Sequence, residues 1–126
     1  MPRKARLVIP GYPHHVTQRG NRRQQIFFDA SDYQAYLDLL VEFKGKAGVD
    51  IWAYCLMPNH VHMIAVPHRE SSLADCFGVV HKRYADRVNT DREWTGHLWQ
   101  ERFHSLVMDE AHLLVAVRYV ELNPVS

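Results

Sequence analysis

Cysteine and long apolar runs are both scarce in this chain, and each scarcity excludes a class of protein. Cys55 and Cys76 are the only cysteines, and their spacing matches neither a disulfide framework nor a zinc motif, so we expect free thiols in the cytoplasm. The longest apolar runs, such as 113–117, fall far short of the ~20 residues of a membrane-spanning helix. Pro10 and Pro13 interrupt the apolar stretch behind the basic N-terminus, so we expect neither a signal peptide nor a membrane partner.

Acidic residues are missing from the N-terminal part of the chain, because none precedes Asp29. The basic residues ahead of it are Arg3, Lys4, Arg6, Arg19, Arg22 and Arg23, and a second basic group follows at Lys82, Arg83 and Arg87. The net charge of only +1 means that composition alone does not indicate a nucleic-acid partner. A local basic surface can still attract phosphate groups, although a solvated face with a loose N-terminal arm explains the same distribution.

The length of 126 residues, with 47% apolar and 23% charged residues, is typical of one soluble domain, which we expect to span residues 1–126. The pattern predicts seven elements in the order strand, helix, strand, strand, helix, strand, helix. Ser31, with Gln34 three residues later, and Ser72, with Asp75, are the expected helix N-caps. We expect strands over 14–19, 49–56, 60–66 and 103–108, a first helix ending near Gly45 and Gly48, a second after Ser72, and a last one over 110–122 behind Asp109.

The order of the first six elements is that of the split βαβ arrangement, so we expect an α+β, ferredoxin-like fold. In this fold a four-stranded antiparallel sheet carries two helices on one face, and strands 14–19 and 60–66 form its central pair. The spacing of apolar residues also predicts the buried stripe of the second helix, which consists of Leu73, Phe77, Val80, Tyr84 and Val88. The seventh element adds a C-terminal helix to this sandwich.

His60 and His62 are separated by one residue on a predicted strand, so their side chains point to the same face. Two imidazoles placed in this way can converge on one divalent ion. Because the chain contains nine histidines, such pairs also arise by chance, and we take His14-His15 to be one of them. The four residues after His62 carry no carboxylate or imidazole, which disfavours a binuclear hydrolase.

Tyr119 and Asn123 are four residues apart on the predicted last helix and therefore lie on one helix face. Tyr119 is a candidate nucleophile, and Asn123 is a candidate oxygen ligand for an ion such as Mg²⁺ or Mn²⁺, which accepts partly hydrated coordination. The alternative is that both residues have ordinary structural roles. A tyrosine is often a core residue with a solvated hydroxyl, and an asparagine before a proline is common at a helix end.

Four segments together resemble the single-tyrosine HUH transposases, and in particular the REP-associated tyrosine transposases of bacteria. They are HVTQRGNRR at 15–23, YCLMPNHVH at 54–62, LWQERF at 98–103 and RYVELNPV at 118–125. The segments follow the expected order and span nearly the whole chain. One departure is that this sequence ends at Ser126, whereas relatives commonly continue, so we expect it to lack a C-terminal extension and leave open whether the short chain is active.

The resemblance implies a DNA transposase in which His60, His62 and Asn123 hold Mg²⁺ or Mn²⁺ and Tyr119 is the nucleophile. It implies cleavage and rejoining of single-stranded DNA, often near imperfect hairpins, through a 5′-phosphotyrosine intermediate. Members of the family act as monomers or as dimers, so a homodimer stays open here.

Basic residues are expected to contact the DNA backbone: Arg19, Arg22, Arg23, Lys82, Arg83 and Arg102. Trp94 and Trp99 are candidates for stacking on unpaired bases, or for closing the core beneath a loop. Two alternative functions remain. The first is an inactive protein, derived from a transposase, that binds single-stranded DNA or hairpins. The second is an unrelated metal-dependent hydrolase of similar fold.

Overall fold

The structure is a computed structural model, and it describes residues 7–109. Its elements are β1 (His14–Arg19), a 3₁₀ turn (Asn21–Arg23), α1 (Ala30–Ala47), β2 (Val49–Met57), β3 (His60–Pro67), α2 (Ser72–Arg92) and β4 (His104–Val107). The first six predicted elements are therefore confirmed in type and order. The predicted last helix over 110–122 lies outside the described residues.

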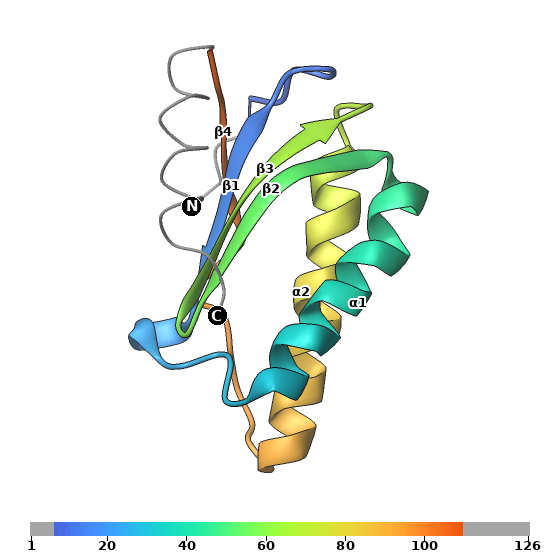
Figure 1. Cartoon of the computed structure of the whole chain (residues 1–126). Coiled ribbons are helices and arrows are strands. Elements are labelled where there is room, and N and C mark those ends of the chain that lie inside the picture. Colours follow the sequence, from blue (N-terminus) through green and yellow to red (C-terminus); the bar gives the residue numbers. More distant parts are fainter. Residues whose placement is uncertain (1–6, 110–126) are drawn as a thin grey trace.

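The four strands form one sheet in the order β2-β3-β1-β4, and every pair of neighbours is antiparallel. The two helices lie side by side on one face of this sheet (Figure 1). β1 and β3 are its central pair, as the split βαβ topology requires. The predicted α+β arrangement of a four-stranded antiparallel sheet and two helices is thus confirmed.

Both predicted helix N-caps are wrong by one or two residues. Asp29 caps α1, because its backbone is extended and its carboxylate accepts the Asp32 N–H at 3.1 Å, whereas Ser31 lies inside the helix and donates to Asp29. The N-cap of α2 is Ser71 rather than Ser72. The Ser72 hydroxyl instead accepts the Arg69 N–H at 3.0 Å, which closes the preceding turn.

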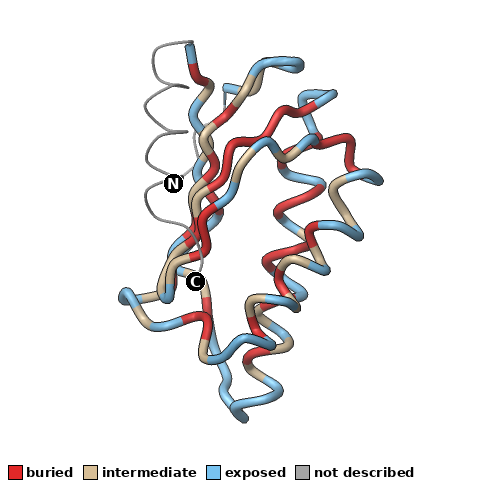
Figure 2. Tube along the Cα trace, viewed as in Figure 1, coloured by how far each residue is buried: buried red, intermediate tan, exposed pale blue. Residues whose placement is uncertain are grey.

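The hydrophobic core fills the space between the sheet and the helices, where buried segments of both layers face each other (Figure 2). All five residues of the predicted stripe on α2 are buried. Tyr84 of that stripe also donates a hydrogen bond of 2.6 Å to the Ile26 carbonyl. This bond fastens the segment between the 3₁₀ turn and α1 onto α2, and so positions the loop that follows β1.

Within residues 7–109, neither helix combines the length and the apolar character that a membrane crossing requires.

The Tyr84 hydroxyl provides a test of this packing. We expect Tyr84→Phe to lower the free energy of unfolding by about 1–3 kcal/mol, because the buried Ile26 carbonyl loses its partner. Urea denaturation followed by circular dichroism measures the change. Tyr54→Phe is the matched control, since Tyr54 is 42% exposed and its change should stay within about 0.5 kcal/mol. Equal losses in the two variants would show that the hydroxyl–carbonyl bond is not the cause.

Candidate metal and nucleic-acid site

His60 and His62 stand on the face of the sheet that is turned away from the two helices. Val61 and Met63, which alternate with them along β3, belong to the core between sheet and helices. The two imidazole rings are 4.6 Å apart between centroids and nearly perpendicular, at 87°. The prediction that both side chains share one face is therefore confirmed, and the rings lie close enough to face one ion.

Each of the two imidazoles is held through its Nδ1 atom. His60 Nδ1 lies 2.7 Å from the Asn59 side-chain oxygen, and His62 Nδ1 lies 3.2 Å from His15 Nε2 on the neighbouring strand β1. His14 and His15 do not share a face of the sheet, which fits a chance pair, but His15 contacts one of the candidate ligands. Adjacent residues on a strand point to opposite faces of the sheet. His14 is therefore buried on the other face, whereas the His15 ring lies against the His62 ring.

Both candidate ligand histidines favour the neutral form, which is the form that binds metal. Burial lowers the pKa of His60, and the Arg19 charge lowers it further. Burial, followed by the charges of His60, His15 and Arg19, lowers the pKa of His62 to about 4. Neutral nitrogen donors on one face fit a divalent ion of the kind the sequence suggests.

The described residues do not form a metal site by themselves. Residues 7–109 contain no group of three or more His, Cys, Asp and Glu side chains that could hold a metal ion. Tyr119 and Asn123, the predicted nucleophile and third ligand, lie outside the described residues. Their roles therefore stay predictions.

Two of the predicted DNA-binding arginines lie next to His60. Arg19 is paired with His60 across β1 and β3, and a pocket of about 240 Å³ is lined by Arg19, Arg23, Asn59 and His60. Arg22 and Arg23 adopt left-handed backbone angles, with φ of 54° and 61°, which are rare for residues other than glycine. Such a strained backbone persists where the surrounding structure enforces it. Here the turn places Arg23 in the pocket beside His60.

The other predicted DNA-binding residues lie elsewhere. Lys82 on α2 and Arg102 line a pocket of about 380 Å³. Lys82 also forms an exposed ion pair with Asp86. Arg83 lies on the helix layer, 5.1 Å from the centre of the Phe43 ring. The structure therefore brings Arg19 and Arg23 to the histidines and does not bring Arg83 there.

The two candidate stacking tryptophans differ in their surroundings. Trp99 packs against His81 and Tyr84 and donates a hydrogen bond of 2.8 Å to the His81 carbonyl, which favours the core-closing alternative. Trp94 is 40% exposed; its ring is nearly perpendicular to that of Phe28, and the Arg92 guanidinium lies 5.7 Å from its centre. Of the two, Trp94 presents the larger free surface for a base.

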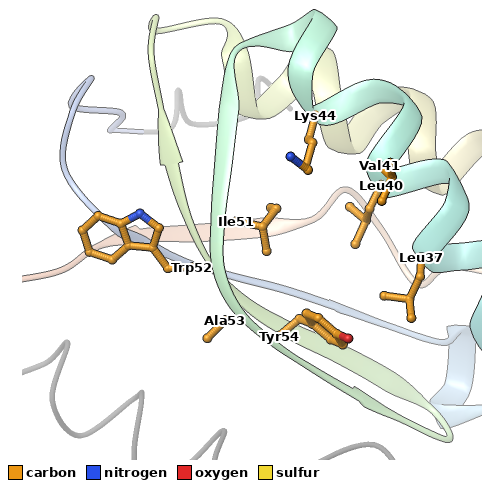
Figure 3. A pocket seen from close by; sticks show the side chains of 8 residues that line it. All are labelled: Leu37, Leu40, Val41, Lys44, Ile51, Trp52, Ala53 and Tyr54. Atoms are coloured by element: carbon orange, nitrogen blue, oxygen red, sulfur yellow. The ribbon is translucent and has the colours of Figure 1, made fainter.

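An apolar groove of about 500 Å³ lies between α1 and β2, away from the histidines (Figure 3). Leu37, Leu40, Ile51 and Tyr54 turn toward one another in this groove, whereas Trp52 points away from them. Trp52 occupies an irregularity in the pairing of β2 with β3, between Ile51 and Ala53. Nothing in the sequence indicates this groove, because its residues carry no distinctive motif.

The lowered pKa of His62 makes a measurable prediction. In the folded protein the imidazole should stay neutral down to a pH of about 4, whereas in urea it should titrate near its ordinary value of 6.5. Between these two values the unfolded chain binds a proton that the folded chain does not, so stability should fall as the pH falls through this window. NMR titration of labelled histidine measures both midpoints. A folded-state midpoint near 6.5 would contradict the buried environment.

Comparisons with known proteins bear on the whole chain. The family model described as "Transposase IS200 like" matches residues 10–123. A solved structure of a REP-associated tyrosine transposase bound to a REP hairpin is similar to this chain, with a TM-score of 0.70 and 23% identity, over 98% of this chain and 73% of the other. A crystal structure of a candidate transposase from Deinococcus radiodurans R1 has a TM-score of 0.64 and 19% identity, over 99% of this chain and 100% of the other. Comparison with curated protein sequences gives no match.

At these identities the likeness to solved structures shows the shared fold, and the family rests on the sequence match. That match includes the segment with both histidines as well as positions 119 and 123, and it confirms the resemblance found in the sequence. The chain belongs to the IS200-like transposase family.

Proposed function

We propose that this chain is a metal-dependent transposase that cleaves and rejoins single-stranded DNA through a 5′-phosphotyrosine on Tyr119. The observation that carries the proposal is the pair of neutral imidazoles, His60 and His62, directly beside the cationic pocket of Arg19 and Arg23. Neutral imidazoles suit a divalent ion, and the two guanidinium groups suit the phosphate that such an ion would engage. Membership of the IS200-like family supports the reaction class.

The substrate we propose is single-stranded DNA that forms a hairpin. A protein of similar fold has been solved with a REP hairpin, which supports this class of substrate. Arg19, Arg22 and Arg23 would contact the backbone near the reacting phosphate, and Lys82 and Arg102 would contact a more distant part of the strand. Contacts of this kind position DNA without reading its bases, so they do not predict a recognised sequence.

His60, His62 and Asn123 are the residues that we propose to hold Mg²⁺ or Mn²⁺. Two nitrogen ligands and one amide oxygen leave positions for water and for a phosphate oxygen. When bound, the ion polarises the phosphate and orients the scissile bond.

Tyr119 would then carry the covalent chemistry. Its phenolic oxygen forms a bond to phosphorus, the bond from phosphorus to the 3′ oxygen breaks, and this oxygen takes a proton to become a free 3′-hydroxyl. The phenolic proton passes to water or to a nearby base, because tyrosine is mostly protonated at neutral pH, with an unperturbed pKa of about 10. A second 3′-hydroxyl attacks the phosphotyrosine, which rejoins DNA and restores Tyr119 without ATP.

A covalent adduct provides the first test of this function. We expect the full chain, incubated with labelled single-stranded DNA from the flanks of its own gene and with Mg²⁺ or Mn²⁺, to give a protein–DNA band on a denaturing gel. Tyr119→Phe should reduce this band to background because the nucleophilic oxygen is lost, and His60→Ala should do so because a proposed ligand is lost. Tyr54→Phe is the control, since it removes an exposed phenol from β2.

The alternatives give different results in the same assay. Tight DNA binding without any adduct, with either metal and across several flanking strands, would indicate an inactive binding protein and would overturn the proposed activity. Cleavage without an adduct would indicate a hydrolase.

The arginine pocket makes a separate prediction about affinity. We expect Arg19→Ala and Arg23→Ala each to weaken binding of single-stranded DNA and to reduce the slope of log affinity against log salt by about 0.7, the value for one lost phosphate contact. Arg83→Ala is the matched control, because this guanidinium lies over the Phe43 ring on the helix layer. Fluorescence anisotropy at several salt concentrations measures the slopes. An equal reduction in all three variants would show that the DNA path is not centred on the histidine side of the sheet.

A further inference from the structure

The hydrogen bonds behind the two candidate ligand histidines determine which ring nitrogen each can offer to a metal. A neutral imidazole carries its proton on one nitrogen and its lone pair on the other, and only the lone pair binds a metal. A partner that accepts a proton from Nδ1 therefore leaves the lone pair on Nε2. Asn59 and His15 are the groups in contact with the two Nδ1 atoms.

Asn59 determines the tautomer of His60. The Asn59 oxygen lies 2.7 Å from His60 Nδ1, and this oxygen can only accept a hydrogen bond. The amide nitrogen lies 3.5 Å from the Arg23 carbonyl, which favours the same orientation of the amide. Reversing the amide would place two oxygens against each other. His60 therefore carries its proton on Nδ1 and its lone pair on Nε2.

His15 likewise contacts Nδ1 of its neighbouring histidine, but its Nε2 atom, unlike the Asn59 oxygen, can either accept or donate. The contact between His15 Nε2 and His62 Nδ1, at 3.2 Å, holds one proton, which belongs to one ring or the other. Only the arrangement in which His62 donates leaves the lone pair of His62 on Nε2, as in His60. The two ring planes differ by 13° and their centroids are 5.3 Å apart, so this contact also sets the rotation of the His62 ring.

We propose that Asn59 and His15 are positioning residues, each accepting the Nδ1 proton of its neighbouring histidine and so directing Nε2 of His60 and His62 to the metal. The two positioning residues come from different places in the chain. Asn59 belongs to the turn between β2 and β3, and His15 belongs to β1, diagonal to His62 across the Thr17–His62 pair. This inference rests on the metal site of the proposed function, but the tautomers exist without metal and can be measured by themselves.

The tautomers can be read from long-range ¹H–¹⁵N spectra of the full, metal-free chain labelled with ¹⁵N-histidine. We expect the Nδ1–H form for both His60 and His62. In Asn59→Ala the His60 signal should shift to a mixture of the two tautomers, and in His15→Ala the His62 signal should do the same. Asn59→Asp and His15→Gln should restore the Nδ1–H forms, because each supplies an accepting oxygen.

Metal affinity is the second readout, measured as free Mn²⁺ by electron paramagnetic resonance. We expect Asn59→Ala and His15→Ala each to weaken Mn²⁺ binding by about tenfold, the lower end of the effect of losing such a partner. The rescuing variants should regain most of this affinity. His104→Ala is the matched control, since His104 is opposite Thr17 on β4 and contacts Glu101 rather than either ligand histidine.

The outcomes separate this inference from the proposed function. An Nε2–H form of either histidine in the unchanged protein would overturn the inference. Unchanged tautomers and affinities in both alanine variants would also overturn it. Both Nδ1–H forms without any Mn²⁺ binding would refute the metal site of the proposed function while supporting the hydrogen-bond assignment.

Discussion

The antiparallel pairing of β1 with β3 is the interaction on which the rest of the site depends. It places Arg19 opposite His60 and Thr17 opposite His62, so that the polar residues of both strands share one face. The same pairing turns Val16 and Met63 toward the helices, where they join the core. Because side chains alternate along a strand, a shift of one residue would exchange these two sets. Burial of the apolar set thus holds the polar set in register.

The central position of this pair has an electrostatic consequence. Strands in the middle of a sheet are flanked on both sides, so imidazoles that stand on them are partly removed from water. Burial is accordingly the largest cause of the lowered pKa values of His15, His60 and His62. The fold therefore keeps these histidines neutral by burial, and among the described residues Arg19 and Arg23 supply positive charge beside His60.

Periodicity and composition were sufficient to predict the six described elements and the sheet order, since alternation, helical spacing and turn residues are local signals. Helix starts were less predictable, because Asp29, Ser31, Ser71 and Ser72 are all suitable caps by residue type and the sequence alone does not distinguish them. For the site, the spacing of His60 and His62 was enough to predict that both side chains lie on one face of the sheet. The contact between His15 and His62 could not be predicted in this way, because it depends on the register between two strands that lie far apart in sequence.

Arg19 shows how one charge can serve two purposes at the site. As a cation beside His60 it disfavours a second positive charge, and so adds to the effect of burial in keeping both imidazoles neutral. As a member of the pocket with Arg23 it would attract the phosphate backbone of the proposed DNA substrate. A carboxylate in its place would have the opposite effect on both counts, because it would favour protonated histidine and repel DNA. The arginine at position 19 therefore suits the chemistry of the histidine pair as much as the chemistry of the proposed DNA substrate.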